Sequence, residues 1–212
     1  MENIDKIVFI NLSKRKDRLQ EIHEQFENYH FPKEKILRFE AIETPHYGLI
    51  GCGKSHIEVL KMAKENQWKN VLILEDDFQI VVSEEEFYNS LRYFFSTIHL
   101  QQSWDVLMLA YNLNNPGNYG KSFHNNDQIG QIGYAQTASA YLVNQHYYDI
   151  LIDNLIEANE ELSKTGRHWD FANDVYWKTL QEKDTWLYFK NRLSIQRPSY
   201  SNNGNTFTDY KV

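Results

Sequence analysis

Three consecutive acidic residues, Glu75, Asp76 and Asp77, close the most apolar run of the chain, at residues 71–74. In an extended strand successive side chains alternate between faces, so Glu75 and Asp77 are predicted to point the same way and Asp76 the other way. Two carboxylates on one face are hard oxygen ligands that suit Mn²⁺ or Mg²⁺ together with substrate phosphates. Acids at the end of a core strand cost stability unless something compensates, which favours a metal site over the alternative, a solvated strand end.

A second group of residues, at 169–177, combines aromatic rings with carboxylates. Such a mixture binds sugars, because rings stack on sugar faces and carboxylates accept hydrogen bonds from hydroxyl groups. Asp170 and Asp174 are four positions apart and would share one face of a helix, so one of them is the expected general base. Trp169 and Trp177 are the expected acceptor contacts. The alternative is that Trp177 and its apolar neighbours belong to the core.

The segment Gly48 to Ser55 satisfies the phosphate-loop pattern GxxxxGK[ST] at every fixed position. In that motif the first glycine directly follows a strand, and the loop wraps phosphates with backbone N–H groups. Here residues 43–47, which include Pro45, separate Gly48 from the preceding predicted strand. A nucleotide hydrolase or kinase that uses Gly48 to Ser55 therefore stands as an alternative to a flexible turn in which Ser55 caps the next helix.

Hydrophobic periodicity predicts alternating strands and helices that would position these residues. Ser13 is the expected cap of the first helix. Two capping boxes, Ser55 with Glu58 and Ser83 with Glu86, predict the starts of two further helices. The predicted strands cover residues 6–11, 36–42, 71–74, 106–110 and 134–143, the later helices cover 147–158 and 171–180, and a loop covers 43–53.

Two segments have no predicted regular structure. Residues 112–133 are rich in Asn and Gly and lack periodicity, which is typical of a flexible loop or lid. Residues 197–212 form a polar tail rich in Ser and Asn. The alternation elsewhere predicts a single α/β domain over residues 1–212, with a mostly parallel central sheet flanked by helices. Ligands of such folds bind outside the carboxyl ends of the strands, where residues 75–77 fall.

The composition excludes several classes of protein. The 212 residues suffice for one large domain, and 42% of them are hydrophobic. A net charge of -7 predicts no nucleic-acid partner, although a divalent ion would still bridge an anionic substrate. Cys52 is the only cysteine, which rules out an intrachain disulfide. No apolar stretch is long enough for a transmembrane segment or a signal peptide, so we expect a cytoplasmic protein.

Taken in order, these motifs resemble glycosyltransferase family 25, the lipooligosaccharide-type and collagen-modifying galactosyltransferases. The resemblance spans most of the chain and is closest before Asp77. Its residues are Ile10-Asn11-Leu12 with Arg15, Asp17 and Arg18, then Arg38 to Ala41, Gly51-Cys52 with Ser55-His56, Leu72 to Asp77, Ser139 to Val143, Asn173 to Val175 and Gln196 to Ser201.

The resemblance implies a glycosyltransferase-A fold, a UDP-sugar donor that is usually UDP-galactose, and inversion at the anomeric carbon. It also implies a glycan, lipooligosaccharide or glycoprotein acceptor. Asp174 is the expected base, because its Asn-Asp-Val context matches a later element of the family. Glu75 and Asp77 are the expected ligands of Mn²⁺ or Mg²⁺, and His56 and His168 are candidates for a third. The expected donor contacts are Asn11, Arg15, Arg18, Glu43, Ser55, His56 and Asp76.

Other functions remain open at this point. An inactive carbohydrate-binding module of the same fold would ignore Mn²⁺ and UDP, and a phosphohydrolase would use the same acids for another reaction. Arg15 and Arg18 have an alternative as well, since arginines in a lysine-rich first helical turn are often only solvated.

Overall fold

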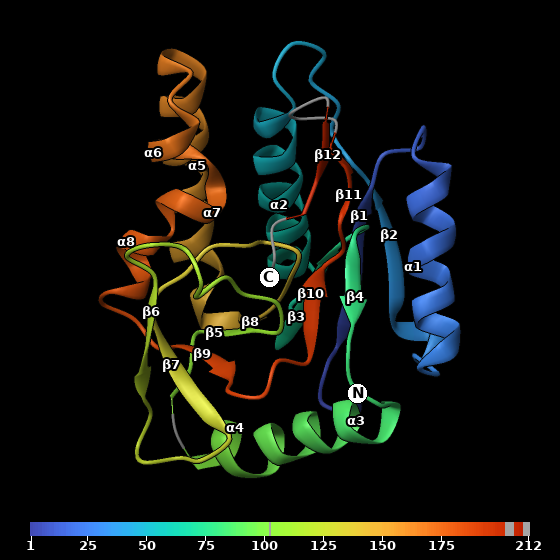
Figure 1. The fold of residues 1–212 in the computed structure, drawn as a ribbon, viewed down its shortest axis with the longest axis vertical. Coiled ribbons are helices and arrows are strands. Elements are labelled where there is room, and N and C mark those ends of the chain that lie inside the picture. The colour runs from blue at the N-terminus through green and yellow to red at the C-terminus, as the bar shows by residue number, and fades with distance from the viewer. Residues whose placement is uncertain (102, 202–205, 210–212) are drawn as a thin grey trace.

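A mixed eight-stranded sheet forms the centre of the computed structural model (Figure 1), which describes residues 1–101, 103–201 and 206–209. Its strands β1 and β2, β1 and β3, and β5 and β9 pair in parallel, whereas the other neighbours are antiparallel. The order is β2 (Ile36–Glu40), β1 (Lys6–Asn11), β3 (Asn70–Glu75), β8 (Ala140–Asn144), β5 (Val106–Met108), β9 (Trp186–Phe189), β7 (Ile129–Tyr134) and β6 (Tyr119–Ser122).

Helices cover both faces of this sheet, which gives the single α/β domain that the sequence predicts. Helices α1 (Lys16–Asn28) and α3 (Glu84–Tyr93) pack on one face, and α2 (Gly48–Glu65) and α5 (Tyr148–Thr165) on the other. Figure 1 shows α2 and α5 running beside each other. The central strands β1 and β3 are buried on both faces, which explains their uninterrupted apolar runs.

The remaining elements are short. They are the helices α4 (His99–Gln101), α6 (His168–Phe171), α7 (Asn173–Tyr176) and α8 (Lys178–Gln181), 3-10 turns at Lys33–Lys35 and Gln145–Tyr147, a π-helical turn at Phe94–Ile98, and the strands β4 (Phe78–Ile80), β10 (Ser194–Gln196), β11 (Ser199–Ser201) and β12 (Thr206–Thr208). Strand β10 pairs antiparallel with β4, and β11 with β12. Among the described residues no helix has the length and apolar character needed to cross a membrane.

Helix α2 begins earlier than the sequence predicts, and this excludes the phosphate loop. The segment from Gly48 to Ser55 is helical, so its N–H groups from Cys52 onward bond within the helix and cannot wrap a phosphate. The N–H groups of Ile50 and Gly51 bond to Tyr47 and Thr44. Ser55 is not a cap, because its Oγ donates to the Gly51 carbonyl at 2.8 Å and accepts from the Ile42 N–H at 2.9 Å. Lys54 is exposed.

Two glycines of α2, Gly51 and Gly53, allow close packing. A Cβ at Gly51 would lie 2.2 Å from the carbonyl oxygen of Ile42, and a Cβ at Gly53 would lie 2.3 Å from Nδ2 of Asn159 on α5. Helix α2 therefore sits against the segment after β2 and against α5 at distances that only glycine permits.

Other local predictions have mixed outcomes. Ser83 caps α3 as expected, with its Oγ accepting from the Glu86 N–H at 3.2 Å. Ser13 does not cap α1, which starts at Lys16, and its N–H instead donates to Glu40 at 2.7 Å. The helix predicted over 171–180 is broken, because Ala172 is extended with ψ 145°. Asp170 and Asp174 consequently lie on different short helices and share no helix face.

The two segments predicted without regular structure contain strands. Strand β6 and most of β7 fall within residues 112–133, and the strand predicted over 134–143 is β8 together with the end of β7. In the polar tail the structure describes β11 and β12, while residues 202–205 and 210–212 lie outside the described part of the chain. The lid role of residues 112–133 stays a prediction.

Gly51→Ala is expected to lower the free energy of unfolding by about 1–3 kcal/mol, the usual cost of overpacking. The new Cβ would meet a backbone oxygen at 2.2 Å, and alanine's better helix propensity, worth about 1 kcal/mol, offsets only part of the clash. Urea unfolding measures the difference. Lys54→Ala, at an exposed position of the same helix, is the control and should change stability by less than about 0.5 kcal/mol. Equal stability of Gly51→Ala and wild type would contradict the close packing.

Candidate active site

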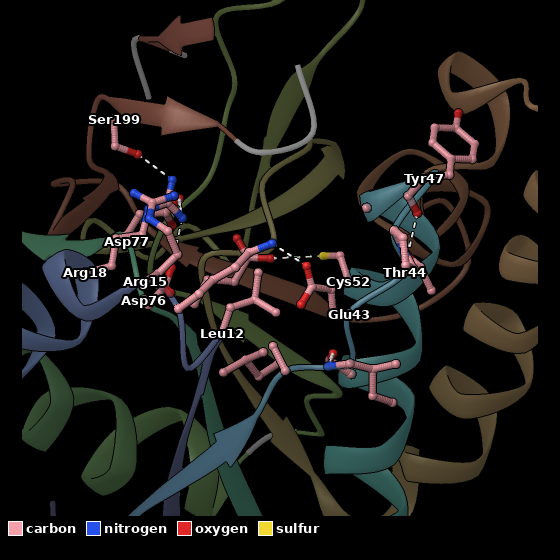
Figure 2. A pocket seen from close by; sticks show the side chains of 18 of the residues that line it. Leu12, Arg15, Arg18, Glu43, Thr44, Tyr47, Cys52, Asp76, Asp77 and Ser199 are labelled. Carbon is pink, nitrogen blue, oxygen red and sulfur yellow. Dashed lines mark hydrogen bonds and ion pairs between the residues drawn. The ribbon is translucent and has the colours of Figure 1, made fainter. Parts of the chain in front are cut away.

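A cavity of about 400 Å³ opens at the carboxyl ends of β1 and β3, within the usual range for a small-molecule site. Ile10 pairs with Glu75, so the loops that follow these strands lie side by side. Figure 2 shows Arg15, Arg18, Asp76 and Asp77 on one side of the cavity and the segment after β2 on the other. The predicted edge of the sheet is therefore where the acids lie.

Asp76 and Asp77 are buried and share one cation. Nη1 of Arg18 lies 2.8 Å from Oδ1 of Asp76 and 3.0 Å from Oδ2 of Asp77. Asn11 donates from Nδ2 to Asp76 at 2.7 Å, and Gln196 donates from Nε2 to Asp77 at 3.2 Å. The carboxylates thus receive partners from β1, α1 and β10. Both carboxylates are removed from solvent, since only 6% of Asp76 and 3% of Asp77 is exposed.

The ion pair with Arg18 does not fully compensate for the burial of the Asp77 carboxylate. Burial, helped by the nearby charge of Glu75, raises the pKa of Asp77 to about 7, although Arg18 opposes the shift. Burial likewise raises the pKa of Asp76. Oδ1 of Asp77 is buried and has no hydrogen-bond partner among the described residues. A buried acceptor of this kind fits a bound cation, which would satisfy the oxygen and hold the carboxylate in its charged form.

Glu75 is engaged by α2 and not by Arg18, so the predicted strand alternation of the three acids is wrong. Strand β3 ends at Glu75, and Asp76 and Asp77 form a turn that brings both to Arg18. Oε1 of Glu75 instead accepts from Nε2 of His56 at 3.1 Å and from Sγ of Cys52 at 3.4 Å. Burial works to raise the pKa of Glu75, but these hydrogen bonds and the His56 charge outweigh it and lower that pKa.

Asp174 is half-buried beside this group and holds a strained loop. Its Oδ2 accepts from the Thr137 N–H at 3.1 Å, and Thr137 has φ +89°, a conformation that β-branched residues rarely adopt. Burial raises the pKa of Asp174 while the Thr137 hydrogen bond opposes it, and the charge of Glu75 contributes to the rise. Its neighbour Asn173 approaches Cys52, with Nδ2 at 3.9 Å from the sulfur.

The structure places several predicted residues away from this centre. Asp170 pairs with Arg167 near the surface. Trp169 is 63% exposed on α6, whereas Trp177 is fully buried, so it presents no surface to an acceptor and the core alternative describes it. His168 is exposed and is not among the described residues that could group around an ion, whereas His56 is.

Five of the seven predicted donor contacts, Arg15, Arg18, Glu43, Ser55 and Asp76, line the cavity. Asn11 and His56 do not line it and instead hydrogen-bond Asp76 and Glu75. Arg15, which also pairs with Asp17 at 2.8 Å, and Glu43, which pairs with Lys14, both line it. Ser55 lines it too, but its hydroxyl is committed to the backbone contacts of α2.

Three residues of the site, Cys52, Tyr141 and Gln196, were not predicted as site residues, although all three lie in segments that carry the family resemblance. Gln196 reaches Asp77 only because β10 folds back onto β4. Tyr141 belongs to a predicted strand, yet its hydroxyl lies 2.7 Å from Nδ1 of His56. Cys52 and His56 are four positions apart, which places them on one face of a helix. That spacing would reveal the pair only if residues 48–53 were predicted as helical.

Asp77→Asn is expected to stabilise the protein at pH 8 in EDTA. The pKa of Asp77 is about 7 in the folded protein and 3.8 ordinarily. The contribution of Asp77 to the free energy of unfolding is therefore fully present below pH 3.8 and is lost as pH rises through 7. Removing the charge should gain on the order of 2–4 kcal/mol at pH 8 and almost nothing at pH 4. Urea unfolding of both proteins across this range measures the difference.

Asp153→Asn is the matched control, because Asp153 is an exposed acid on α5. It should change stability by less than about 0.5 kcal/mol at either pH. A gain from Asp77→Asn that is the same at both pH values would show that the buried charge is not its cause.

Comparisons with known proteins support the fold. No protein-family model matches the chain, and no curated protein matches its sequence. Among solved structures, it resembles a mannose-1-phosphate geranyltransferase from Thermus thermophilus, with TM-score 0.51, 10% identity and 92% of this chain and 74% of that chain covered.

Two glycosyltransferases are more distant. One is GlyE in Streptococcus pneumoniae TIGR4, with TM-score 0.47, 11% identity and coverage of 89% of this chain and 45% of that chain. The other is involved in the glycosylation of the major capsid of PBCV-1, with TM-score 0.43, 11% identity and coverage of 88% of this chain and 93% of that chain. At such identities the similarity to the Thermus protein concerns the fold alone, a single α/β domain with helices on a mixed sheet.

Proposed function

We propose that this chain is a metal-dependent, inverting glycosyltransferase that moves a sugar, galactose by the resemblance to family 25, from a UDP-sugar to a hydroxyl group of a glycan, lipooligosaccharide or glycoprotein. The observation that carries the proposal is the buried carboxylate of Asp77, whose Oδ1 lacks a partner among the described residues, at a cavity that arginines also line. Carboxylates for an ion and guanidinium groups for phosphates are the two requirements of a nucleotide-diphosphate site.

The residues around Asp77 suit Mn²⁺ or Mg²⁺. Such ions need only one or two carboxylates in addition to phosphate oxygens and water, so Asp77 with Glu75 suffices. When bound, the ion would neutralise the charge that builds on the departing diphosphate. Arg18 now holds the same carboxylate at 3.0 Å. A cation at Asp77 would compete with this guanidinium, and the released Arg18 would be placed, with Arg15, to hold the phosphates of the donor.

Asp174 is the proposed base. A base removes the proton of the acceptor hydroxyl, and it does so best when its pKa approaches the working pH. Burial raises the pKa of Asp174 in that direction. Asp170 is the weaker candidate, because it pairs with Arg167 on a more exposed part of the chain.

A panel of UDP-sugars, assayed for released UDP in Mn²⁺ with glycan acceptors, tests the function directly. UDP release that requires both the acceptor and the ion is the expected result. Release of inorganic phosphate would indicate a phosphohydrolase. Formation of a UDP-sugar from UTP and a sugar 1-phosphate would indicate a nucleotidyltransferase. Glycan binding that ignores Mn²⁺ and UDP would indicate an inactive binding module.

Asp77→Asn should abolish both transfer and the metal requirement of UDP binding, because a neutral amide loses the charge that holds the ion. Isothermal titration calorimetry with UDP, in Mn²⁺ and in EDTA, measures the effect on wild type and variant. Asp153→Asn should bind UDP as wild type does. If wild-type protein binds UDP equally well in EDTA, the metal is not part of the site.

Asp174→Asn should reduce transfer by about 10²- to 10⁴-fold, the usual contribution of a positioned base, while UDP affinity in Mn²⁺ stays near wild type. The same two measurements on Asp170→Asn give the matched comparison, and there the loss should be small. Circular dichroism must show an intact fold, because Asp174 also anchors Thr137. Loss of UDP affinity would make Asp174 a donor contact, and wild-type transfer would assign the base elsewhere.

A further inference from the structure

A cysteine, a histidine and a glutamate meet at the inner wall of the cavity. Cys52 and His56 lie one turn apart on α2, and Glu75 ends β3. The Cys52 sulfur, a His56 ring nitrogen and a Glu75 carboxylate oxygen all lie within 4.8 Å of one another. Within the described residues, these three are the group of potential metal-ligating side chains whose atoms converge in this way. Asp77 is not one of its members.

The spacing of these atoms suits a tetrahedral ion. Oε1 of Glu75 is 3.1 Å from Nε2 of His56 and 3.4 Å from Sγ of Cys52. Metal–ligand bonds of about 2.0–2.3 Å in a tetrahedron place neighbouring ligand atoms roughly 3.3–3.8 Å apart. Small side-chain adjustments would therefore admit an ion between them.

The surroundings of the group also match a metal site. His56 is fully buried, and its Nδ1 lies 2.7 Å from the Tyr141 hydroxyl, which fixes the ring so that Nε2 faces Glu75. Outer-shell partners of this kind orient most metal-bound histidines. Cys52 and Glu75 also line the cavity, so an ion would have an entry path and an open coordination position.

We propose that Cys52, His56 and Glu75 form a binding site for a borderline-soft divalent ion of the Zn²⁺ class, with its fourth position open to the cavity. Thiolate and imidazole ligands select Zn²⁺ over Mn²⁺ and Mg²⁺, which prefer the oxygen ligands at Asp77. On binding, the S–H bond of Cys52 breaks, its proton passes to solvent and the sulfur bonds to the ion. The proton on Nε2 of His56 also leaves, so that Nε2 bonds to the ion and the neutral ring keeps its proton on Nδ1, toward the Tyr141 hydroxyl. This site shares Glu75 with the proposed Mn²⁺ site, but ion binding at Cys52 and His56 needs neither nucleotide nor sugar, so it is tested without the transferase reaction.

Cobalt(II) is the probe for the test, since a cobalt–thiolate bond produces a near-ultraviolet charge-transfer band that imidazole and carboxylate ligands do not. Cys52 is the only cysteine in the sequence, so the band reports on this sulfur alone. Titration of the wild-type chain should give a band that saturates near about one equivalent, that Zn²⁺ displaces and that excess Mg²⁺ leaves intact. Absence of the band in wild type overturns the proposal, whatever the variants do.

Variants then locate the site. Cys52→Ser should lose the band and weaken Zn²⁺ binding, measured by competition with a chromophoric chelator, by at least about 100-fold. Tyr141→Phe should keep the band and weaken Zn²⁺ binding by about 10- to 100-fold. Asp77→Asn should keep both, which separates this site from the acids at Arg18.

The control is His146→Ala. His146 is an exposed histidine whose Nε2 lies 2.7 Å from Asp105, so it reproduces the histidine–carboxylate pair without a cysteine. It should leave both the band and the Zn²⁺ affinity unchanged. If Cys52→Ser binds Zn²⁺ as tightly as wild type, the three side chains form a hydrogen-bonded network only and the proposal fails.

Discussion

The burial of Asp76 and Asp77 and the partial burial of Glu75, at the end of β3, form the constraint on which the site depends. An ionised carboxylate removed from water is costly unless it is paired and hydrogen-bonded. Two helices meet the three acids: Arg18 of α1 holds both Asp76 and Asp77, and His56 of α2 holds Glu75. The N-terminal half and the C-terminal strand β10 are therefore held together around one group of charges.

Helix α2 supplies the partners of Glu75 because its backbone can pack closely against neighbouring segments. Gly51 and Gly53 let it lie against the segment after β2 and against α5, and this position brings Cys52 and His56 to Glu75. Gly53 is also a fixed position of the phosphate-loop pattern, whose other fixed glycine is Gly48. A residue that matches a loop motif can thus serve helix packing instead, because both structures need a backbone without side chains.

Several features that reduce stability gather around the cavity. Thr137 has φ +89°, a strain of about 1–3 kcal/mol, and Asp174 keeps it in place. One oxygen of Asp77 lacks a partner among the described residues. The two apolar layers, one on each face of the sheet, compensate for this loss of stability. Concentration of strain and unmet polar groups at one place is typical of sites where ligand contacts complete the structure.

The sequence by itself determined the features that arise from local order. Apolar runs predicted β1 and β3, Ser83 predicted the start of α3, and the acids at 75–77 marked the edge of the α/β sheet at which the cavity lies. Tertiary structure alone decided which partner each charge would have. Gln196 contacts Asp77 from 119 positions away, and the hydroxyl of Ser55, which lies inside α2, accepts from the N–H of Ile42. Periodicity and caps report on neighbours along the chain, whereas the compensation of buried charge depends on contacts that only the folded chain creates.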